Sequence, residues 1–140
     1  MNTVNAASKP WRIWFEHDVA HDAVIGHFEN VILATAADAA RWRAEVSQQL
    51  ATYGDKVDLI INLEGLVVKV GAGSAFGRER AAVLQEFTRH SYRYGGDQLT
   101  RSFVNTSGMI TGADTNHHAT REAALKALLA VRGAARVGAR

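Results

Sequence analysis

The chain opens with an alternation of apolar and polar side chains over residues 11–17. Trp11, Ile13 and Phe15 fall on one side and the residues between them on the other, which is the period of a β-strand. Residues 23–32 have the composition of a second strand, and the short polar segment 18–22 suits a hairpin turn. The chain is therefore expected to begin with a β-hairpin.

A period of three to four residues then replaces the alternation. Thr35 followed by Asp38 resembles a capping box, in which each residue bonds the backbone N–H of the other, and Gly54 stands where a C-cap glycine is expected. The apolar residues of this period are Ala39, Trp42, Val46, Leu50 and Tyr53. An amphipathic helix is predicted between Thr35 and Gly54.

Residues 56–70 form the most apolar run of the chain, and such a run is typical of a strand buried on both faces inside a sheet. A glycine- and serine-containing loop, "GAGSAFG" (71–77), follows it. A second helix is predicted next, ended by "RYGGDQ" (93–98). The residues that mark its apolar stripe are Ala81, Leu84, Phe87 and Ser91.

The last third of the chain is expected to add a strand and a helix. Residues 100–107 have the pattern of a strand, with 109–111 as a short additional one. Residues 120–133 have the pattern of a helix with Thr120 as N-cap and Gly133 at its end. Its expected inner face consists of Leu125, Leu128 and Leu129.

The predicted order is β-β-α-β-α-β(β)-α. A hairpin followed by strands alternating with helices predicts an α/β fold, with a mixed sheet of four to five strands and about three helices. A chain of 140 residues has the size of one domain. We assign 1–10 to a flexible leader, 11–133 to this domain and 134–140 to a frayed basic tail.

Composition narrows the function classes. The absence of cysteine removes disulfides and thiolate chemistry and is compatible with the cytoplasm. No run approaches the roughly 18–20 apolar residues of a membrane-spanning helix, and the N-terminus lacks a secretory apolar region. The net charge of +2 does not favour nucleic acid as a partner. Residues 1–70 carry six Lys/Arg against nine Asp/Glu and residues 71–140 carry ten against five, so the basic second half could face an anionic partner.

Three segments carry a resemblance to a known family. They are the opening hairpin "WRIWFEHDVAHDAVIGHFENVI", the strand "VDLIINLEGL" that enters the Gly/Ser loop, and the closing "TREAALKALL". Together they cover residues 11–132, and their order resembles the STAS domain, most closely the bacterial SpoIIAA-like proteins of the STAS–Sec14 type. The resemblance implies a non-enzymatic regulatory domain. In STAS antagonists of anti-sigma factors, a partner kinase phosphorylates a Ser or Thr at this strand-to-helix junction, and Ser74 is the residue that aligns with it. The family's acidic residue and paired Ser/Thr are absent here, where "VKVGAG" stands instead.

The same loop can be analysed from its residues. Ser74 is placed to cap the next helix, while Gly71 and Gly73 would allow positive φ angles and a close approach of the backbone. Free N–H groups at a helix start, together with Arg78 and Arg80, would favour an anion. Two interpretations stay open: a structural cap alone, or a site for a ligand or modification. The spacing disfavours a dinucleotide fingerprint and a nucleophile elbow.

We therefore expect a STAS-like regulatory or binding domain without a cofactor. Its partner would be a protein, or a small anionic or lipid-like ligand, bound at Gly71, Gly73, Ser74 and Arg78. The alternative is a small nucleotide- or lipid-binding protein or enzyme that uses the loop for phosphate. Trp11 and Trp14 fall on opposite sides of the first strand, so one of them could lie under a partner subunit, and a homodimer is a further expectation.

Other chemistry-bearing groups are weaker candidates. His17 and Asp22 could meet across the hairpin, and His117 and His118 lie near Asp114, but neither place offers an evident set of three metal ligands. Residues 89–94 interleave arginine with tyrosine. We interpret this segment as a helix end with tyrosines on the core, in preference to a base-stacking surface.

Overall fold

The protein is an α/β fold built on a mixed sheet. The computed structural model describes residues 10–111 and 117–138. Five strands form the main sheet in the order β1-β2-β4-β6-β7, in which β1 is antiparallel to β2 and all other neighbours are parallel. In chain order the elements are β1 (Arg12–Asp18), β2 (Ala23–Glu29), β3 (Val31–Leu33), α2 (Ala36–Ala51), β4 (Val57–Asn62), β5 (Leu66–Val68), the 3-10 turn η1 (Val70–Ala72), α3 (Gly73–Phe87), β6 (Thr88–Tyr94), α4 (Gln98–Thr111), β7 (His117–His118) and α5 (Arg121–Gly138).

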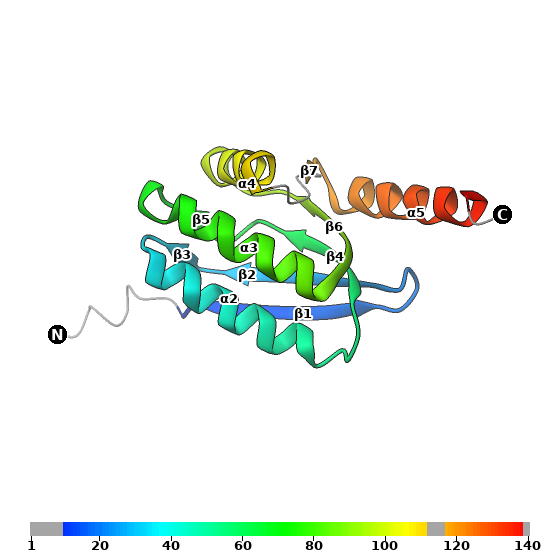
Figure 1. Cartoon of the computed structure of the whole chain (residues 1–140), viewed down its shortest axis with the longest axis horizontal. Helices are drawn as coiled ribbons and strands as arrows, with labels where there is room; N and C mark the ends of the chain where they lie inside the picture. Colours follow the sequence, from blue (N-terminus) through cyan, green and yellow to red (C-terminus); the bar gives the residue numbers. More distant parts are fainter. Residues whose placement is uncertain (1–9, 112–116, 139–140) are drawn as a thin grey trace.

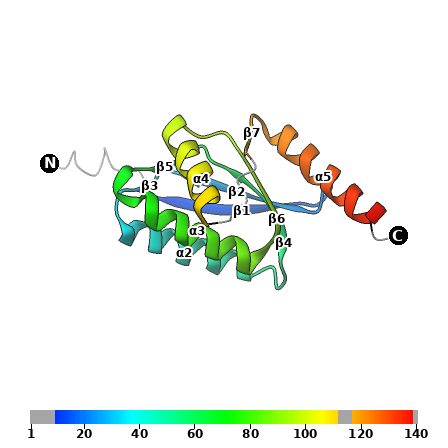
Figure 2. The same cartoon turned by 45° about the horizontal axis from the view of Figure 1, so that its top comes forward.

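The helices cover the two faces of the sheet unequally. Helices α2 and α3 run side by side over one face, as Figure 1 shows, and α4 packs against α3 and β5. Helix α5 lies on the opposite side of the strands (Figure 2), where it contacts β4, β6 and β7. The class and the mixed sheet confirm the prediction, although four helices occur in the described residues in place of about three.

Two apolar cores follow from this layering. The larger lies between the sheet and α2 and α3, and the smaller between the sheet and α5. Side chains alternate across a strand, so β4 supplies Leu59 to the first core and Ile60 to the second. The buried residues of the smaller core are Ala23, Ile25, Ile60, Tyr92, Ala124, Leu125 and Leu128. Burial of β4 on both faces confirms its predicted central place.

The first helix matches its prediction closely. The Thr35 hydroxyl accepts a hydrogen bond from the N–H of Asp38 (3.2 Å), and the Asp38 carboxylate accepts one from the N–H of Thr35 (3.1 Å). This is the expected capping box. The helix ends at Ala51, three residues before Gly54, whose φ of 76° belongs to the turn that follows.

The apolar run 56–70 is two strands. Gly65 has a φ of +82°, and a Cβ added there would lie 2.2 Å from the carbonyl oxygen of Phe28. Only glycine meets both requirements, and the turn it makes separates β4 from β5. Asn30, with a φ of 55°, divides the predicted strand 23–32 into β2 and β3 in the same way. Strands β3 and β5 then pair in parallel as a small second sheet.

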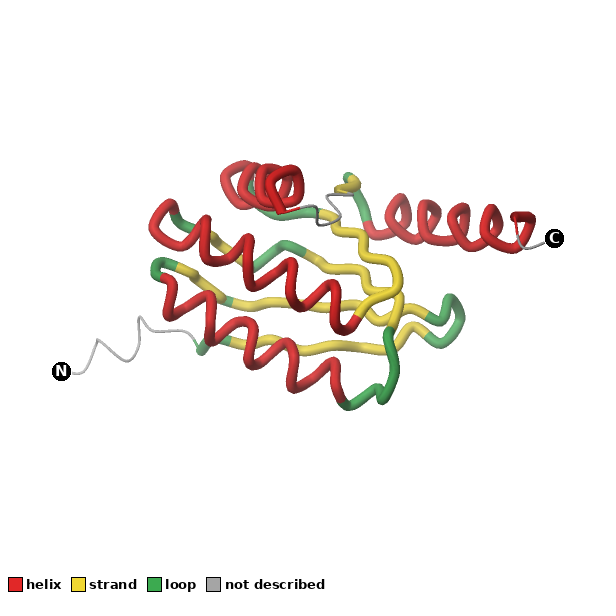
Figure 3. Tube along the Cα trace, viewed as in Figure 1, coloured by secondary structure: helices red, strands yellow, loops and turns green. Residues whose placement is uncertain are grey.

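The second helix is shorter than its apolar stripe predicted. Helix α3 ends at Phe87 and passes into β6 with no loop between them (Figure 3). The Thr88 hydroxyl donates to the carbonyl of Leu84 (2.7 Å), which closes the last turn. Ser91, counted as the last helical position, is a strand residue that faces α3, while Tyr92 faces α5. The two-residue alternation of 88–94 is the signal that the helical stripe concealed.

The strands predicted at 100–107 and 109–111 are wrong, because this segment is helix α4. Asp97 begins the helix: its carboxylate accepts from the N–H of Thr100 (2.8 Å) and from its hydroxyl (3.0 Å). Thr100 and Val104 are buried four residues apart, which is helical spacing. The Thr100 hydroxyl also accepts from the N–H of Val68 (3.1 Å), so α4 covers the open edge of β5.

Helix α5 begins as predicted and ends later. The Thr120 hydroxyl accepts from the N–H of Ala123 (3.1 Å), which confirms the N-cap. The helix continues through Gly133 to Gly138, so the predicted end at Gly133 is wrong. Leu125 and Leu128 face the sheet, whereas Leu129 is 43% exposed. No helix in the described ranges has the length and apolar character needed to cross a membrane.

Candidate functional site

Ser74 lies inside the first turn of α3. The helix begins at Gly73, its N-cap is Ala72, and no side chain bonds the free amides there. The Ser74 side chain is exposed, and its hydroxyl accepts a hydrogen bond from the guanidinium of Arg78 (3.0 Å). The prediction that Ser74 caps the helix is therefore wrong. The pairing of Ser74 with Arg78 is a contact one helical turn apart.

Gly71 and Gly73 are required for close packing. A Cβ on Gly71 would lie 2.7 Å from the carbonyl oxygen of Ala34, and one on Gly73 would lie 2.5 Å from the Phe103 ring. The predicted close approach of the backbone is confirmed at Gly71, whereas neither glycine has a positive φ, so that part of the prediction is wrong. Residues 71–73 thus pack closely against the segment before α2 on one side and against helix α4 on the other.

The start of α3 has a defined exposed surface. Lys69, Val70, Gly71, Ser74 and Arg78 are all exposed, and Val70 keeps 77% of its surface open to solvent. We call these five residues the α3 entry surface. The amides of Ala72 and Gly73 already donate to the carbonyls of Lys69 and Val70 in turn η1. An anion would therefore meet side-chain cations here more readily than a set of free backbone amides.

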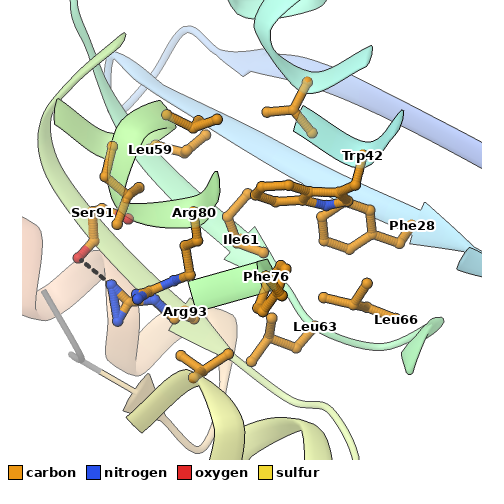
Figure 4. Close-up of a pocket in the computed structure, with 14 residues that line it drawn as sticks. Phe28, Trp42, Leu59, Ile61, Leu63, Leu66, Phe76, Arg80, Ser91 and Arg93 are labelled. Carbon is orange, nitrogen blue, oxygen red and sulfur yellow. Dashed lines mark hydrogen bonds between the residues drawn. The ribbon is translucent and has the colours of Figure 1, made fainter. Parts of the chain in front are cut away.

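A cavity lies behind α3, on the core side of the sheet (Figure 4). Its volume is about 20 Å³, which suits a water molecule and excludes a larger ligand. Arg80 and Arg93 reach it from α3 and β6, and Arg93 donates to the carbonyl of Ser91 (3.2 Å). The remaining walls are mainly apolar: Phe28, Trp42, Val46, Leu59, Ile61, Leu63, Leu66, Phe76, Val83, Leu84, Ser91 and Val104.

The histidine candidates form pairs. His17 and Asp22 meet across the hairpin at 3.2 Å, as the sequence suggested. The Nε2 of His117 lies 2.8 Å from the carbonyl oxygen of Gly95. Asp114 falls outside the described residues. Across 10–111 and 117–138, no group of three or more His, Asp or Glu side chains is arranged to hold a metal ion.

The arginine–tyrosine segment 89–94 is strand β6, so the helix-end interpretation is wrong. Tyr92 does pack on a core, the one beneath α5. Arg89 donates to the carbonyl of Lys56, and its Nε lies 3.8 Å from the carboxylate of Asp58. This arginine therefore ties β6 to the start of β4.

A buried carboxylate anchors α5. The Asp58 side chain accepts from Arg132 twice (2.7 and 3.0 Å) and contacts the Nδ1 of His90 at 2.8 Å. Arg132 also donates to the carbonyls of His21 and Asp22 in the hairpin (2.5 and 2.6 Å). Burial alone would raise the pKa of the Asp58 carboxyl. The hydrogen bonds from Arg132 and His90 outweigh burial and hold this pKa below its ordinary value of 3.8.

A row of polar and aromatic side chains crosses the sheet on the α5 side. Trp14 pairs with His27, Asn62 with Tyr94, and Tyr94 with His118. His27 follows the Gly26–Ile61 pair, so it is level with Asn62. Asn62 and Tyr94 are the last residues of parallel strands, and open α/β sheets bind ligands outside the carboxyl ends of their strands. The row follows from strand order and register, which the sequence did not provide.

Hydrogen bonds join this row into a chain. His27 Nε2 and a Glu16 oxygen are 2.6 Å apart, and His27 Nδ1 lies 3.5 Å from the Asn62 amide nitrogen. Asn62 Oδ1 accepts from the N–H of Glu64 (3.0 Å), and the Glu64 carboxylate accepts from the N–H of Gly96 (2.8 Å). Because Asn62 Oδ1 is an acceptor, its nitrogen faces His27, which places the proton of a neutral His27 on Nε2 toward Glu16.

Arg121, at the start of α5, lies beside the row. Its guanidinium is 3.6 Å from Glu16 and 3.7 Å from Asp18, longer than hydrogen bonds. Burial raises the pKa of the Tyr94 phenol above 10.0, although the cation of Arg121 opposes this effect. Tyr94 therefore stays protonated at neutral pH and can donate a hydrogen bond.

A scan against protein-family models and a search of curated protein sequences both returned no match to this chain.

Proposed function

We propose that the chain is a non-enzymatic, STAS-like binding domain that engages an acidic protein surface through the α3 entry surface. The proximity of the exposed Val70 to the exposed cations Lys69 and Arg78 supports this proposal. Val70 keeps 77% of its surface exposed, follows Lys69 directly and precedes the helical turn that carries the Ser74–Arg78 pair.

The charges around Val70 favour an acidic partner. Lys69 and Arg78 are both exposed, and residues 71–140 carry ten Lys/Arg against five Asp/Glu. The acidic residue next to Arg78 in the sequence, Glu79, is paired with Arg43 of α2 at 3.0 Å. Within residues 10–111 and 117–138, neither Lys69 nor Arg78 forms an ion pair with a carboxylate. Complementary charge on a partner would support both association rate and specificity.

A small anion has less support than a protein. Two amides at the start of α3 already donate hydrogen bonds within turn η1. The space beside Gly71 and Gly73 is occupied by Ala34 and Phe103. A phosphate cradle needs several amides that point at the ligand. A protein surface needs only the exposed side chains.

The test compares partner capture by four forms of the tagged chain. These are the wild type, Val70→Asp, Arg78→Glu and, as matched control, Lys126→Glu, which alters an exposed charge on α5. Proteins cross-linked in cells are quantified for each form. We expect at least one protein to be retained by wild type and control and reduced about tenfold or more by both entry-surface variants. Equal capture by all four forms would refute the proposal.

A parallel titration separates the small-anion alternative. Inorganic phosphate is added to ¹⁵N-labelled protein while the amides of residues 72–75 are followed by NMR. Saturable chemical-shift changes confined to those amides would favour a phosphate-bearing ligand over a protein partner.

A further inference from the structure

A second candidate site lies on the opposite side of the sheet, where α5 leaves the carboxyl edge uncovered. Helix α5 covers Ile25, Ile60 and Tyr92 with its apolar residues. The next residues on the same face are His27, Asn62 and Tyr94, and all three are only partly buried. Arg121 borders them on the α5 side, and Glu64 borders them beyond the end of β4. We call His27, Asn62, Glu64, Tyr94 and Arg121 the edge basin.

One end of the edge basin offers hydrogen-bond donors. The Arg121 guanidinium is 3.6 Å from Glu16 and 3.7 Å from Asp18, and it is hydrogen-bonded to the Tyr94 phenol, so a ligand carboxylate would compete with these two side-chain carboxylates for its remaining N–H groups. The Tyr94 phenol lies beside Arg121 and remains protonated. A guanidinium and a phenol side by side are suited to a carboxylate.

The other end offers acceptors. Glu64 is exposed, and the N–H of Gly96 holds one of its carboxylate oxygens at 2.8 Å. Gly95 has a φ of +74°, and a Cβ there would lie 2.8 Å from that Glu64 oxygen and 3.4 Å from Asn62 Oδ1. Because Gly95 has no side chain, the Glu64 carboxylate can lie beside the Asn62 amide oxygen. A carboxylate next to an amide oxygen is suited to an ammonium group.

The side chains between the two ends are held in one orientation. His27 is fixed by Glu16 at 2.6 Å, and Trp14 stacks on its ring with a centroid distance of 5.3 Å. Only 15% of the His27 side chain is exposed. A ligand would thus meet a preorganised surface with a donor end and an acceptor end, which lowers the entropic cost of binding.

We propose that the edge basin binds a small zwitterion of the amino-acid class. Its carboxylate is bound by Arg121 and Tyr94, and its ammonium group by Glu64 and Asn62. A ligand with one charge alone satisfies one end and leaves the other end desolvated without a partner, which disfavours it. This site is separate from the α3 entry surface and does not depend on the function proposed for that surface.

The experiment is an NMR titration of the full chain with free amino acids of increasing length, from glycine to L-lysine. Acetate and methylammonium are the single-charge probes. We expect at least one amino acid to saturate shifts at the Asn62 side-chain amide and the His27 ring, with an affinity at least tenfold above both single-charge probes. Failure of every amino acid, or equal affinity for acetate or methylammonium, overturns the proposal.

Variants assign the two ends. Arg121→Gln and Glu64→Gln should each weaken the bound amino acid by about tenfold or more, since each removes a charge-assisted hydrogen bond. Glu86→Gln, an exposed change on α3, is the matched control and should leave the affinity unchanged. Arg121 also contacts Glu16 and could displace α5 when it is replaced. Glu64, whose carboxylate accepts from the N–H of Gly96, is therefore the second position, and Glu64→Gln separates lost recognition from a displaced helix. An unchanged affinity in Glu64→Gln refutes the assigned ammonium end.

Discussion

The buried Asp58 cluster makes the sharpest prediction about stability. Asp58→Asn keeps the size of the side chain and removes its charge, while Arg132 and His90 stay in place. Asp58 is 4% exposed and receives three hydrogen bonds from these two side chains, at 2.7, 2.8 and 3.0 Å. Removing one partner of a buried ion pair costs about 3–5 kcal/mol.

The expected loss lies at the lower end of that range. The Arg132 side chain is 22% exposed and keeps its bonds to the carbonyls of His21 and Asp22. We therefore expect Asp58→Asn to lower the free energy of unfolding by about 3 kcal/mol, which for a chain of 140 residues lowers Tm by about 10 °C.

Urea unfolding followed by tryptophan fluorescence measures this loss. Asp55→Asn is the matched control, because Asp55 is exposed and its side chain accepts a local hydrogen bond from the adjacent N–H of Lys56. That control should change stability by less than about 0.5 kcal/mol. Arg132→Met combined with Asp58→Asn should cost less than the sum of the two single changes. A loss below about 0.5 kcal/mol for Asp58→Asn, or strict additivity, would refute the reasoning.

Three further outcomes follow from the same contacts. Because the folded pKa of Asp58 lies below 3.8, its contribution to stability is present above pH 3.8 and is lost as pH falls through the folded pKa. The free energy of unfolding, measured with urea, should therefore fall less steeply below pH 4 in Asp58→Asn than in wild type. Thr35→Ala should cost about 1 kcal/mol by thermal unfolding, since it removes half of a capping box, and a neutral result would contradict the cap. Gly73→Ala should cost about 1–3 kcal/mol through contact with Phe103, whereas Ser74→Ala should stay within about 0.5 kcal/mol; a larger loss for Ser74→Ala would restore the serine as a cap.

Local signals were sufficient for some elements of the fold. The hairpin β1–β2 and the capping box of α2 depend on residues a few positions apart, and both are present. The central place of β4 followed from its continuous apolar run. These features share one property, in that neighbouring residues in sequence determine them.

Other elements needed information from distant segments. Helix α4 depends on the Asp97 cap and on Thr100 facing β5, and the strand-like composition of 100–107 outweighed that cap in the sequence. Strand β6 was concealed because Ser91 happens to continue the helical spacing of α3. Both errors arise where tertiary packing overrides a local pattern.

The candidate sites divide in the same way. Ser74, Arg78 and the close packing of the glycines could be proposed from the sequence, but the segments that pack against Gly71 and Gly73 could not, because Ala34 and Phe103 are distant along the chain. The edge basin joins β2, β4, β6 and α5, so it exists only after strand order and register are known. The one sequence signal for the edge basin is the alternation of β1, which places Trp14 and Glu16 on the face opposite Trp11, Ile13 and Phe15.

The most direct test of the central claim places a photo-cross-linking amino acid at position 70 in cells, with position 126 on α5 as the reference. The account predicts a defined protein adduct at position 70 that Arg78→Glu reduces and that position 126 does not form. No adduct at position 70, or the same adduct at both positions, would contradict binding through the α3 entry surface.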